Sequence, residues 1–207
     1  DVLEKNKKIR GVEHPNTLTS MHNMAKNYLK LGEYEKSKEL NYQVLEIRKK
    51  VLGDEHPSTL STMNSIAQVH VGLGEYEKAK ELNLYVTEKY KKILGIDHPT
   101  TLHSMMTLVM SYIKLGEYEK SKKLIYQVLE VREKVFGSEH PLALESMMLL
   151  AEIYSEMGEY EKSKELNLDV LEKNKKIRGV EHPNTLISMH SLALNYYDMG
   201  EYEKSIE

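Results

Sequence analysis

Five histidines in this chain stand beside a carboxylate, a pairing that both general acid–base catalysis and metal binding use. Each follows a glutamate or an aspartate and precedes a proline, and the five are His14, His56, His98, His140 and His182. They recur every 42 residues, so each occupies the same place in a repeat. Packed helices are separated by about 8–10 Å, whereas a zinc ligand lies within about 2.1 Å of the ion. The pattern therefore predicts five helix caps and no metal site.

The other residues give little support to catalysis. His22 and His190 each lack a neighbouring nucleophile, and the chain contains no cysteine that could act as a nucleophile or a metal ligand. The recurrent glycine motif, Gly-Glu-Tyr-Glu-Lys, is rich in acidic residues, unlike a loop that cradles phosphate. We therefore expect a protein that is not an enzyme and that holds no metal and no cofactor.

The elements that position these residues follow from the repeat. Gly-Glu-Tyr-Glu-Lys begins at Gly32, Gly74, Gly116, Gly158 and Gly200, and the five prolines fall at the same interval of 42 residues. His-Pro-x-Thr opens a helix, because proline at the first helical position costs no hydrogen bond, and the later glycine ends it. In the first unit we expect helix A over 15–31 and helix B over 33–52, packed antiparallel because the connections are short.

The whole chain, 1–207, is predicted to be a single repeat domain cut from a longer array. Residues 1–14 are the end of a B helix and a linker, 15–56, 57–98, 99–140 and 141–182 are full units, and 183–207 is a partial fifth unit. Natural arrays carry polar caps at both ends, and neither end of this sequence shows one. Uncapped terminal helices predict that copies of the chain associate end to end.

Apolar residues at helical spacing mark the buried side of each helix. In the first unit the stripe of helix A is Met21, Met24, Ala25 and Tyr28, and that of helix B is Tyr34, Ser37, Val44 and Leu45. The small Ser37 allows the two helices to approach closely.

These stripes give the pattern Met-x-x-Met-Ala-x-x-Tyr-x-x-x-Gly-x-Tyr-x-x-Ser, which resembles the tetratricopeptide repeat. The 42-residue period, with His-Pro-x-Thr-Leu before helix A and Leu-Glu-Ile-Arg in helix B, is similar to the kinesin light chain type of this repeat. The resemblance implies an all-α fold, a right-handed superhelical solenoid of tandem antiparallel helix-turn-helix repeats. It also implies a non-catalytic scaffold for protein–protein interaction. The chain departs from the family late in helix B, where Asn41, Asn83 and Asn167 replace the usual aromatic residue.

In this family the A helices line the concave face of the superhelix, so the resemblance places a peptide-binding groove there. The lining it implies is Thr19, His22, Lys26, Leu29 and Lys30, then Asn64, Gln68 and Val71, then His103, Met106, Met110, Ile113 and Lys114, then Glu145, Met148, Glu152 and Glu156, and finally Ile187, His190, Leu194, Tyr197 and Asp198. A helical wheel places the first set on one stripe, roughly 140° from the packing stripe. Gly72 lies on this stripe and is interpreted as a weak spot in its helix rather than as room for a partner's backbone.

Segments 1–39 and 169–207 are near copies that differ at eight positions. Four of these differences fall on the five groove positions of the first unit: Thr19 corresponds to Ile187, Lys26 to Leu194, Leu29 to Tyr197 and Lys30 to Asp198. The packing stripe changes only from Met24 to Leu192. Two interpretations remain open, divergence of a binding surface and free drift of exposed residues. The exposed Glu-Lys-Asn-Lys-Lys run of helix B is unchanged, which favours the first.

The groove residues change sign along the array, from Lys26 and Lys30 at one end to Glu152, Glu156 and Asp198 at the other, with an apolar middle. The hypothesis is that the groove binds an extended peptide with an apolar centre and oppositely charged ends. Two alternatives are a structural or self-associating array without a specific ligand, and the regulatory repeat region of a larger signalling protein.

Composition limits the partners further. The net charge of −3 gives no basic surplus for binding nucleic acid or an anionic membrane. No apolar run approaches the roughly 18 residues that a membrane span needs, and the first residues do not form a signal peptide. Together with the absence of cysteine, this predicts a cytoplasmic protein whose partner is a protein or a peptide.

Overall fold

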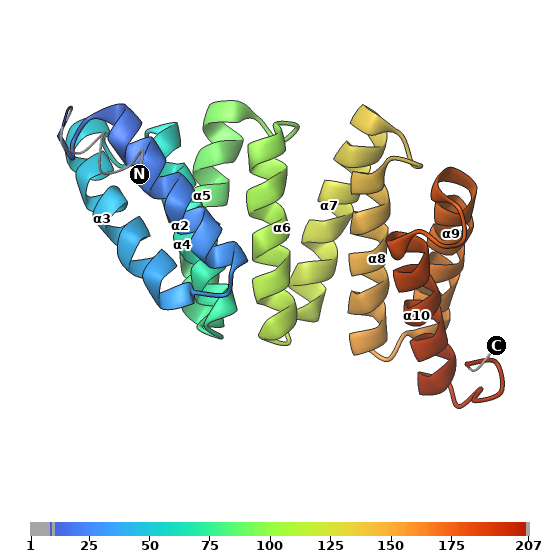
Figure 1. Cartoon of the computed structure of the whole chain (residues 1–207). Coiled ribbons are helices and arrows are strands. Elements are labelled where there is room, and N and C mark those ends of the chain that lie inside the picture. The colour runs from blue at the N-terminus through green and yellow to red at the C-terminus, as the bar shows by residue number, and fades with distance from the viewer. Residues whose placement is uncertain (1–8, 10, 206–207) are drawn as a thin grey trace. The chain divides into compact units, whose positions relative to one another are not determined.

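The computed structural model describes residue 9 and residues 11–205. Within residues 11–205 the chain forms nine α-helices and no strand (Figure 1). The A helices are α2 (Pro15–Lys30), α4 (Pro57–Gly72), α6 (Pro99–Lys114), α8 (Pro141–Glu156) and α10 (Pro183–Asp198). The B helices are α3 (Tyr34–Leu52), α5 (Tyr76–Leu94), α7 (Tyr118–Phe136) and α9 (Tyr160–Arg178). The predicted all-α fold and the alternation of helices A and B are confirmed.

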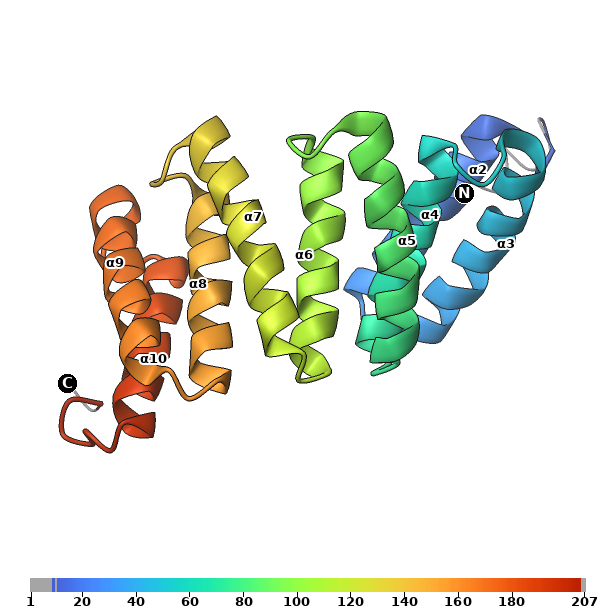
Figure 2. The same cartoon turned by 180° about the vertical axis from the view of Figure 1, so that it is seen from behind.

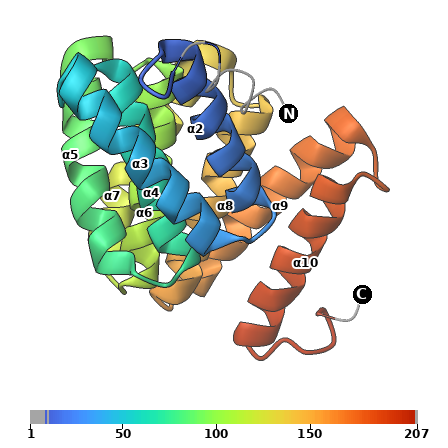
Figure 3. The ribbon, with the colours of Figure 1, turned by 60° about the vertical axis from the view of Figure 1, so that its left-hand side comes forward.

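The chain divides into two compact units, Asp1–Leu115 and Gly116–Glu207. The first unit contains α2 to α6 and the second contains α7 to α10. Within each unit, helices that are adjacent in the sequence pack against each other, and α9 and α10 show the antiparallel arrangement clearly (Figure 3). The division falls between α6 and α7, which is inside the predicted repeat unit 99–140.

A histidine caps the N-terminus of every A helix. Nδ1 of His14 accepts a hydrogen bond from the backbone N–H of Asn16 at 3.1 Å, and the next residue, Pro15, is the first of the helix. His56, His98, His140 and His182 make the same bond to the residue two places on, at 3.1–3.2 Å. An accepting side chain satisfies an amide that the helix leaves without a partner. The predicted capping role is confirmed for all five histidines.

Glycine ends both kinds of helix. The backbone φ is 74° at Gly32 and 87° at Gly53, a left-handed conformation that residues with a Cβ atom rarely adopt. After Gly32, the N–H of Glu33 donates to the carbonyl of Tyr28 at 2.9 Å, which closes α2 with the long hydrogen bond of a Schellman motif. Proline and glycine together therefore fix the helix bounds to within one residue of the prediction.

Each hairpin closes around a small residue of its B helix. Oγ of Ser37, in α3, donates to the carbonyl of Ala25, in α2, at 2.8 Å, and Ser163 makes the same bond to Ala151 at 2.7 Å. The side chain of Ala25 is fully buried, and Met21 and Val44 are packed in the same core. The predicted close approach of the two helices at Ser37 is confirmed.

A hydroxyl on each later A helix accepts a hydrogen bond from the preceding B helix. Nη1 of Arg48 donates to Oγ1 of Thr62 at 2.8 Å, and Thr87 donates to Ser104 at 3.1 Å. In the second unit Arg132 donates to Ser146 at 2.8 Å and Asn174 to Ser188 at 3.0 Å. We call this recurring pair, a polar donor of helix B and a hydroxyl of the next helix A, the joint between hairpins.

Of the predicted segment 1–14, the end of a B helix and a linker, residues 1–8 and 10 lie outside the described residues, and residue 9 is helical. In the described part of the partial fifth unit, 183–207, no second helix follows α10, because residues 202–205 form hydrogen-bonded turns. The N–H of Ser205 bonds to the carbonyl of Tyr202 at 3.2 Å, an i to i−3 bond. No helix among the described residues is long and apolar enough to cross a membrane.

Candidate functional site

The predicted groove residues lie on the A helices of both units and differ in exposure. In the first unit Thr19, Lys26, Lys30, His103 and Lys114 are exposed, and Leu29, Gln68, Val71, Met106 and Met110 are half-buried. In the second unit Glu145, Glu152, Glu156, Ile187, His190, Leu194, Tyr197 and Asp198 are exposed, and Met148 is half-buried. His22, Asn64 and Ile113 are only 5–6 % exposed. The exposed and half-buried members define what we call the A-helix face of each unit.

Hydrogen bonds connect neighbouring A helices across these faces. In the first unit, Nε2 of Gln68 in α4 donates to Nε2 of His103 in α6 at 2.6 Å. In the second unit, Oγ of Ser155 in α8 donates to Oδ2 of Asp198 in α10 at 3.4 Å. Side chains of A helices in successive repeats, 42 residues apart in the sequence, therefore contact each other.

His22 belongs to the packing between helices rather than to the exposed surface. Its Nδ1 lies 3.2 Å from Oδ1 of Asn41, in α3, and its Nε2 lies 3.4 Å from Oγ of Ser61, in α4. Burial, followed by the nearby charges of Lys26 and Arg48, lowers the pKa of His22 to about 4. The ring is therefore uncharged near neutral pH and adds no positive charge to the A-helix face.

Acidic and basic residues are distributed unequally between the A helices of the two units. Helices α2, α4 and α6 contain no aspartate or glutamate, and within the described residues Lys26, Lys30 and Lys114 form no ion pair. Helices α8 and α10 contain no lysine or arginine. Their carboxylates already have polar contacts inside the unit: Glu145 with Arg132 at 3.1 Å and Glu156 with the hydroxyl of Tyr118 at 2.9 Å. The face of the first unit is basic and that of the second is acidic.

Gly72 has a packing reason that the interpretation from the sequence did not include. A Cβ atom at residue 72 would lie 2.5 Å from Cε1 of Tyr34, a residue of the preceding B helix. The space beside Gly72 is thus filled by the chain's own tyrosine, and no partner backbone is needed to explain the glycine. At the corresponding place in the second unit, Tyr118 contacts the longer side chain of Glu156 through its hydroxyl.

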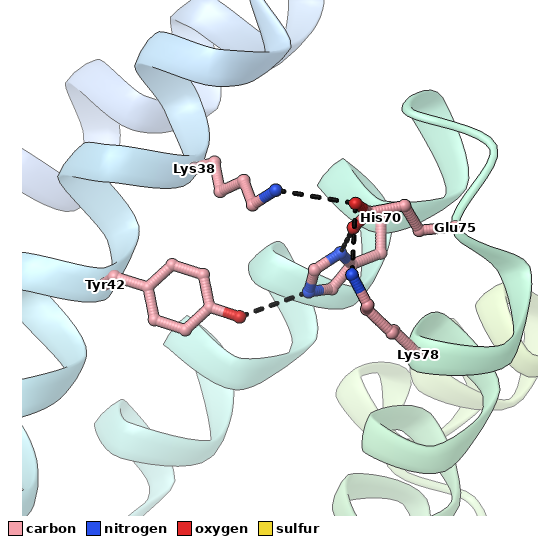
Figure 4. A network of polar contacts seen from close by, with 5 residues as sticks. All are labelled: Lys38, Tyr42, His70, Glu75 and Lys78. Carbon is pink, nitrogen blue, oxygen red and sulfur yellow. Dashed lines mark hydrogen bonds and ion pairs between the residues drawn. The ribbon is translucent and has the colours of Figure 1, made fainter.

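A polar network around the buried His70 in the first unit has the order of groups found in nucleophilic triads (Figure 4). His70, 4 % exposed, bonds through Nδ1 to the carboxylate of Glu75, and its Nε2 lies 3.2 Å from the hydroxyl of Tyr42. Lys78 and Lys38 lie 3.2 and 3.6 Å from the same carboxylate. The hydrogen bonds from His70 and Lys78 lower the pKa of the Glu75 carboxyl. Sequence reasoning missed this network.

The second unit holds a counterpart of this network without a histidine. The hydroxyls of Tyr126 and Tyr154, which correspond to Tyr42 and His70, lie 2.5 Å apart, and Lys122 lies 3.7 Å from Glu159. Burial and the bond to Tyr126 raise the pKa of Tyr154 to about 12, so this phenol is no base near neutral pH. The same contact between hairpins occurs in the second unit without an imidazole ring. We therefore interpret the network of the first unit as a packing contact between hairpins.

The sequence does contain a signal for this network. His70 stands in a column of the repeat that otherwise holds tyrosine, at Tyr28, Tyr112, Tyr154 and Tyr196. Among the described residues, no three His, Asp or Glu side chains come together in a way that could hold a metal ion.

The comparisons with known proteins agree with this geometry. A model of the tetratricopeptide repeat matches residues 1–50, 24–84 and 100–176. Two crystal structures of nearly identical TPR-like repeats from a kinesin light chain of Podosopora anserina have TM-scores of 0.82 and 0.81 and 33 % sequence identity, over 93 % of this chain and 91 % of theirs. A comparison with functionally curated proteins gave no match.

More distant structures share the fold alone. BtubC from P. vanneervenii has a TM-score of 0.79 at 14 % identity, over 99 % of this chain and 81 % of that one. NprR, solved in complex with its cognate peptide NprX, has a TM-score of 0.69 at 19 % identity, over 98 % of this chain and 57 % of that one. The repeat motif, its helix pairs and these similarities lead to one conclusion: the chain belongs to the tetratricopeptide-repeat family, with repeats like those of kinesin light chains.

Proposed function

We propose that the A-helix faces bind a peptide or a segment of a partner protein, and that the chain acts as a non-catalytic interaction scaffold. The observation that carries the proposal is the divergence of exposed residues between two near-identical segments, 1–39 and 169–207. Between α2 and α10 the capping and most of the packing residues are kept, while Thr19, Lys26 and Lys30 are replaced by Ile187, Leu194 and Asp198. All six of these side chains are exposed, so packing does not require the exchanges.

Two further observations support a binding role. The three lysines of the first unit's face form no ion pair among the described residues, so they are available to a partner's carboxylates. The similar fold of NprR holds its cognate peptide in a crystal structure, and peptide binding by an array of hairpins is therefore physically achievable. We also propose a cytoplasmic location, in keeping with a sequence that contains no cysteine.

The test selects peptides from a random library against the full chain and then compares variants. We expect peptides of micromolar affinity, about −8 kcal/mol. For those rich in Asp and Glu, Lys26→Glu together with Lys30→Glu should weaken binding about tenfold or more, because two attractive contacts become repulsive. Affinity would be measured by isothermal titration calorimetry.

The matched control reverses two exposed lysines of B helices, Lys92→Glu with Lys134→Glu, which changes the net charge equally. This control should leave affinity within about twofold of the original. Equal affinity of acidic peptides for the original chain and for the Lys26, Lys30 variant would contradict the placement of the site.

End-to-end self-association is a second candidate, favoured by the packing side of α10. Leu186 is 52 % exposed, whereas the corresponding Leu18, Leu60, Leu102 and Leu144 are at most 3 % exposed. Sedimentation velocity should therefore show mass increasing with concentration, and Leu186→Glu should abolish the increase. Leu84→Glu, at a leucine of α5 that is 40 % exposed, is the control. A monomer at every concentration would rule this candidate out.

A further inference from the structure

Three large apolar side chains of α10 stand on the A-helix face of the second unit. Ile187, Leu194 and Tyr197 are 51, 49 and 60 % exposed. They are seven and then three residues apart, which places them along one side of the helix. Exposed apolar groups that share one surface are a common mark of an interaction site.

The exposure of Ile187 and Leu194 belongs to their positions in the repeat, whereas the residues at the position of Tyr197 in the other A helices are half-buried or buried. At the positions of Ile187 and Leu194, helix α2 has Thr19 and Lys26, and helix α8 has Glu145 and Glu152. All four of these side chains are exposed although another hairpin follows each helix. Packing within the array therefore does not require isoleucine and leucine there, and a polar residue is accommodated at both positions.

A row of carboxylates flanks the apolar residues. Glu145, Glu152 and Glu156 lie along the exposed side of α8, seven and four residues apart. The bond from Ser155 to Asp198 holds α8 and α10 side by side at their C-terminal ends, and Figures 1 and 2 show the two helices from opposite sides. Arg132 forms an ion pair with Glu145, but a carboxylate has about four acceptor sites, so Glu145 can accept hydrogen bonds from further donors.

We propose that the α8–α10 face binds a basic amphipathic segment of a partner protein, an inference that rests on the proposed function and names the partner's chemistry for one unit. Apolar side chains of the segment pack on Ile187, Leu194 and Tyr197. Its lysines and arginines lie over the glutamates of α8, where their charges are complemented. Helices α8 and α10 contain no lysine or arginine, so their carboxylates favour a basic segment over an acidic one.

The probe is a synthetic peptide of lysine and leucine, about 18 residues long, with leucines on one helical face. Its control has the same composition with the leucines scattered over all faces, so both peptides carry the same charge. We expect the amphipathic peptide to bind the full chain at least tenfold more tightly than the scattered one, and its affinity to fall as salt is added. Fluorescence anisotropy of labelled peptides gives both affinities.

Two variants locate the binding. Ile187→Thr, Leu194→Lys and Tyr197→Leu give α10 the residues that α2 already carries, so the helix should still fold, and binding should weaken at least tenfold. Glu152→Gln with Glu156→Gln should weaken binding severalfold and flatten its dependence on salt. Leu168→Lys with Ile177→Thr, at two exposed apolar residues of α9, is the matched control and should leave the affinity unchanged.

The outcomes separate this inference from the proposed function. Equal binding of the two peptides, or full affinity in the α10 triple variant, would overturn the inference. If library-selected peptides still respond to reversal of Lys26 and Lys30 in that case, the interaction scaffold stands without a basic partner at α8–α10. If they do not respond either, both proposals fail.

Discussion

At the scale of single residues, the same amino acid in the same repeat position has different partners. Asn41, Asn83 and Asn167 occupy one column of the B helices and are at most 4 % exposed. The amide of Asn41 contacts His22 and Ser37, and Asn167 donates to Asn195 at 2.5 Å. Neither amide atom of Asn83 has a hydrogen-bond partner within the described residues. The position of these asparagines in the repeat does not reveal which amide lacks a hydrogen bond, because partners such as His22 and Asn195 lie on other helices.

Replacing Asn83 should stabilise the protein. A buried polar group without a partner costs about 1–3 kcal/mol, and the corresponding residue of α7, Ile125, is completely buried. We therefore expect Asn83→Ile to raise the free energy of unfolding by about 1–3 kcal/mol. Urea denaturation followed by circular dichroism would measure the gain.

The paired control for this change is Asn167→Ile. It removes the donor to Asn195 and leaves a buried amide oxygen short of a partner, so it should destabilise the chain by a similar amount. The same sign for both substitutions would contradict the assignment of Asn83 as the unsatisfied member.

At the scale of elements, proline, histidine and glycine allowed the helices to be predicted closely, because each acts through its own backbone geometry. The exposure of the groove residues could not be predicted as well. The wheel of one helix places His22, Asn64 and Ile113 on the groove stripe, but all three are buried. For His22 the reason is visible in its contacts with α3 and α4. One helix wheel contains no information about such neighbours.

Gly72 illustrates the same limit and gives a second prediction. Alanine normally favours a helix over glycine, but Gly72 is the last residue of α4, and a Cβ atom there would meet the ring of Tyr34. We expect Gly72→Ala to destabilise the protein by about 1–3 kcal/mol, the usual cost of overpacking. Thermal unfolding of the variant would show the sign directly.

A double-mutant cycle tests the cause. In a Tyr34→Ala background the ring is gone, so Gly72→Ala should become stabilising by up to about 1 kcal/mol. If the substitution had the same effect in both backgrounds, contact with Tyr34 would not be the reason for the glycine.

At the scale of the whole molecule, the repeat in the sequence was sufficient to predict the fold class and the family. The residues that distinguish one unit from another were harder to interpret, because the charge and the exposure of equivalent side chains differ between units although the repeat motif is the same. The lysines of α2 and the carboxylates of α8 and α10 are exposed, and their role in binding stays a prediction. The division into two compact units between α6 and α7 has no mark in the sequence, since the connection there keeps the motif Gly-Glu-Tyr-Glu-Lys.

The joints between hairpins bear on how such an array changes its length during evolution. The acceptor at every joint is a small hydroxyl, on Thr62, Ser104, Ser146 or Ser188, whereas the donor is an arginine, a threonine or an asparagine. When one 42-residue unit is duplicated or deleted, the B helix on one side of the new junction still carries a donor. The A helix on the other side still carries a hydroxyl, so the hydrogen bond of the joint can form. Gene recombination can therefore lengthen or shorten the protein in whole units, and each copy then diverges on its exposed face.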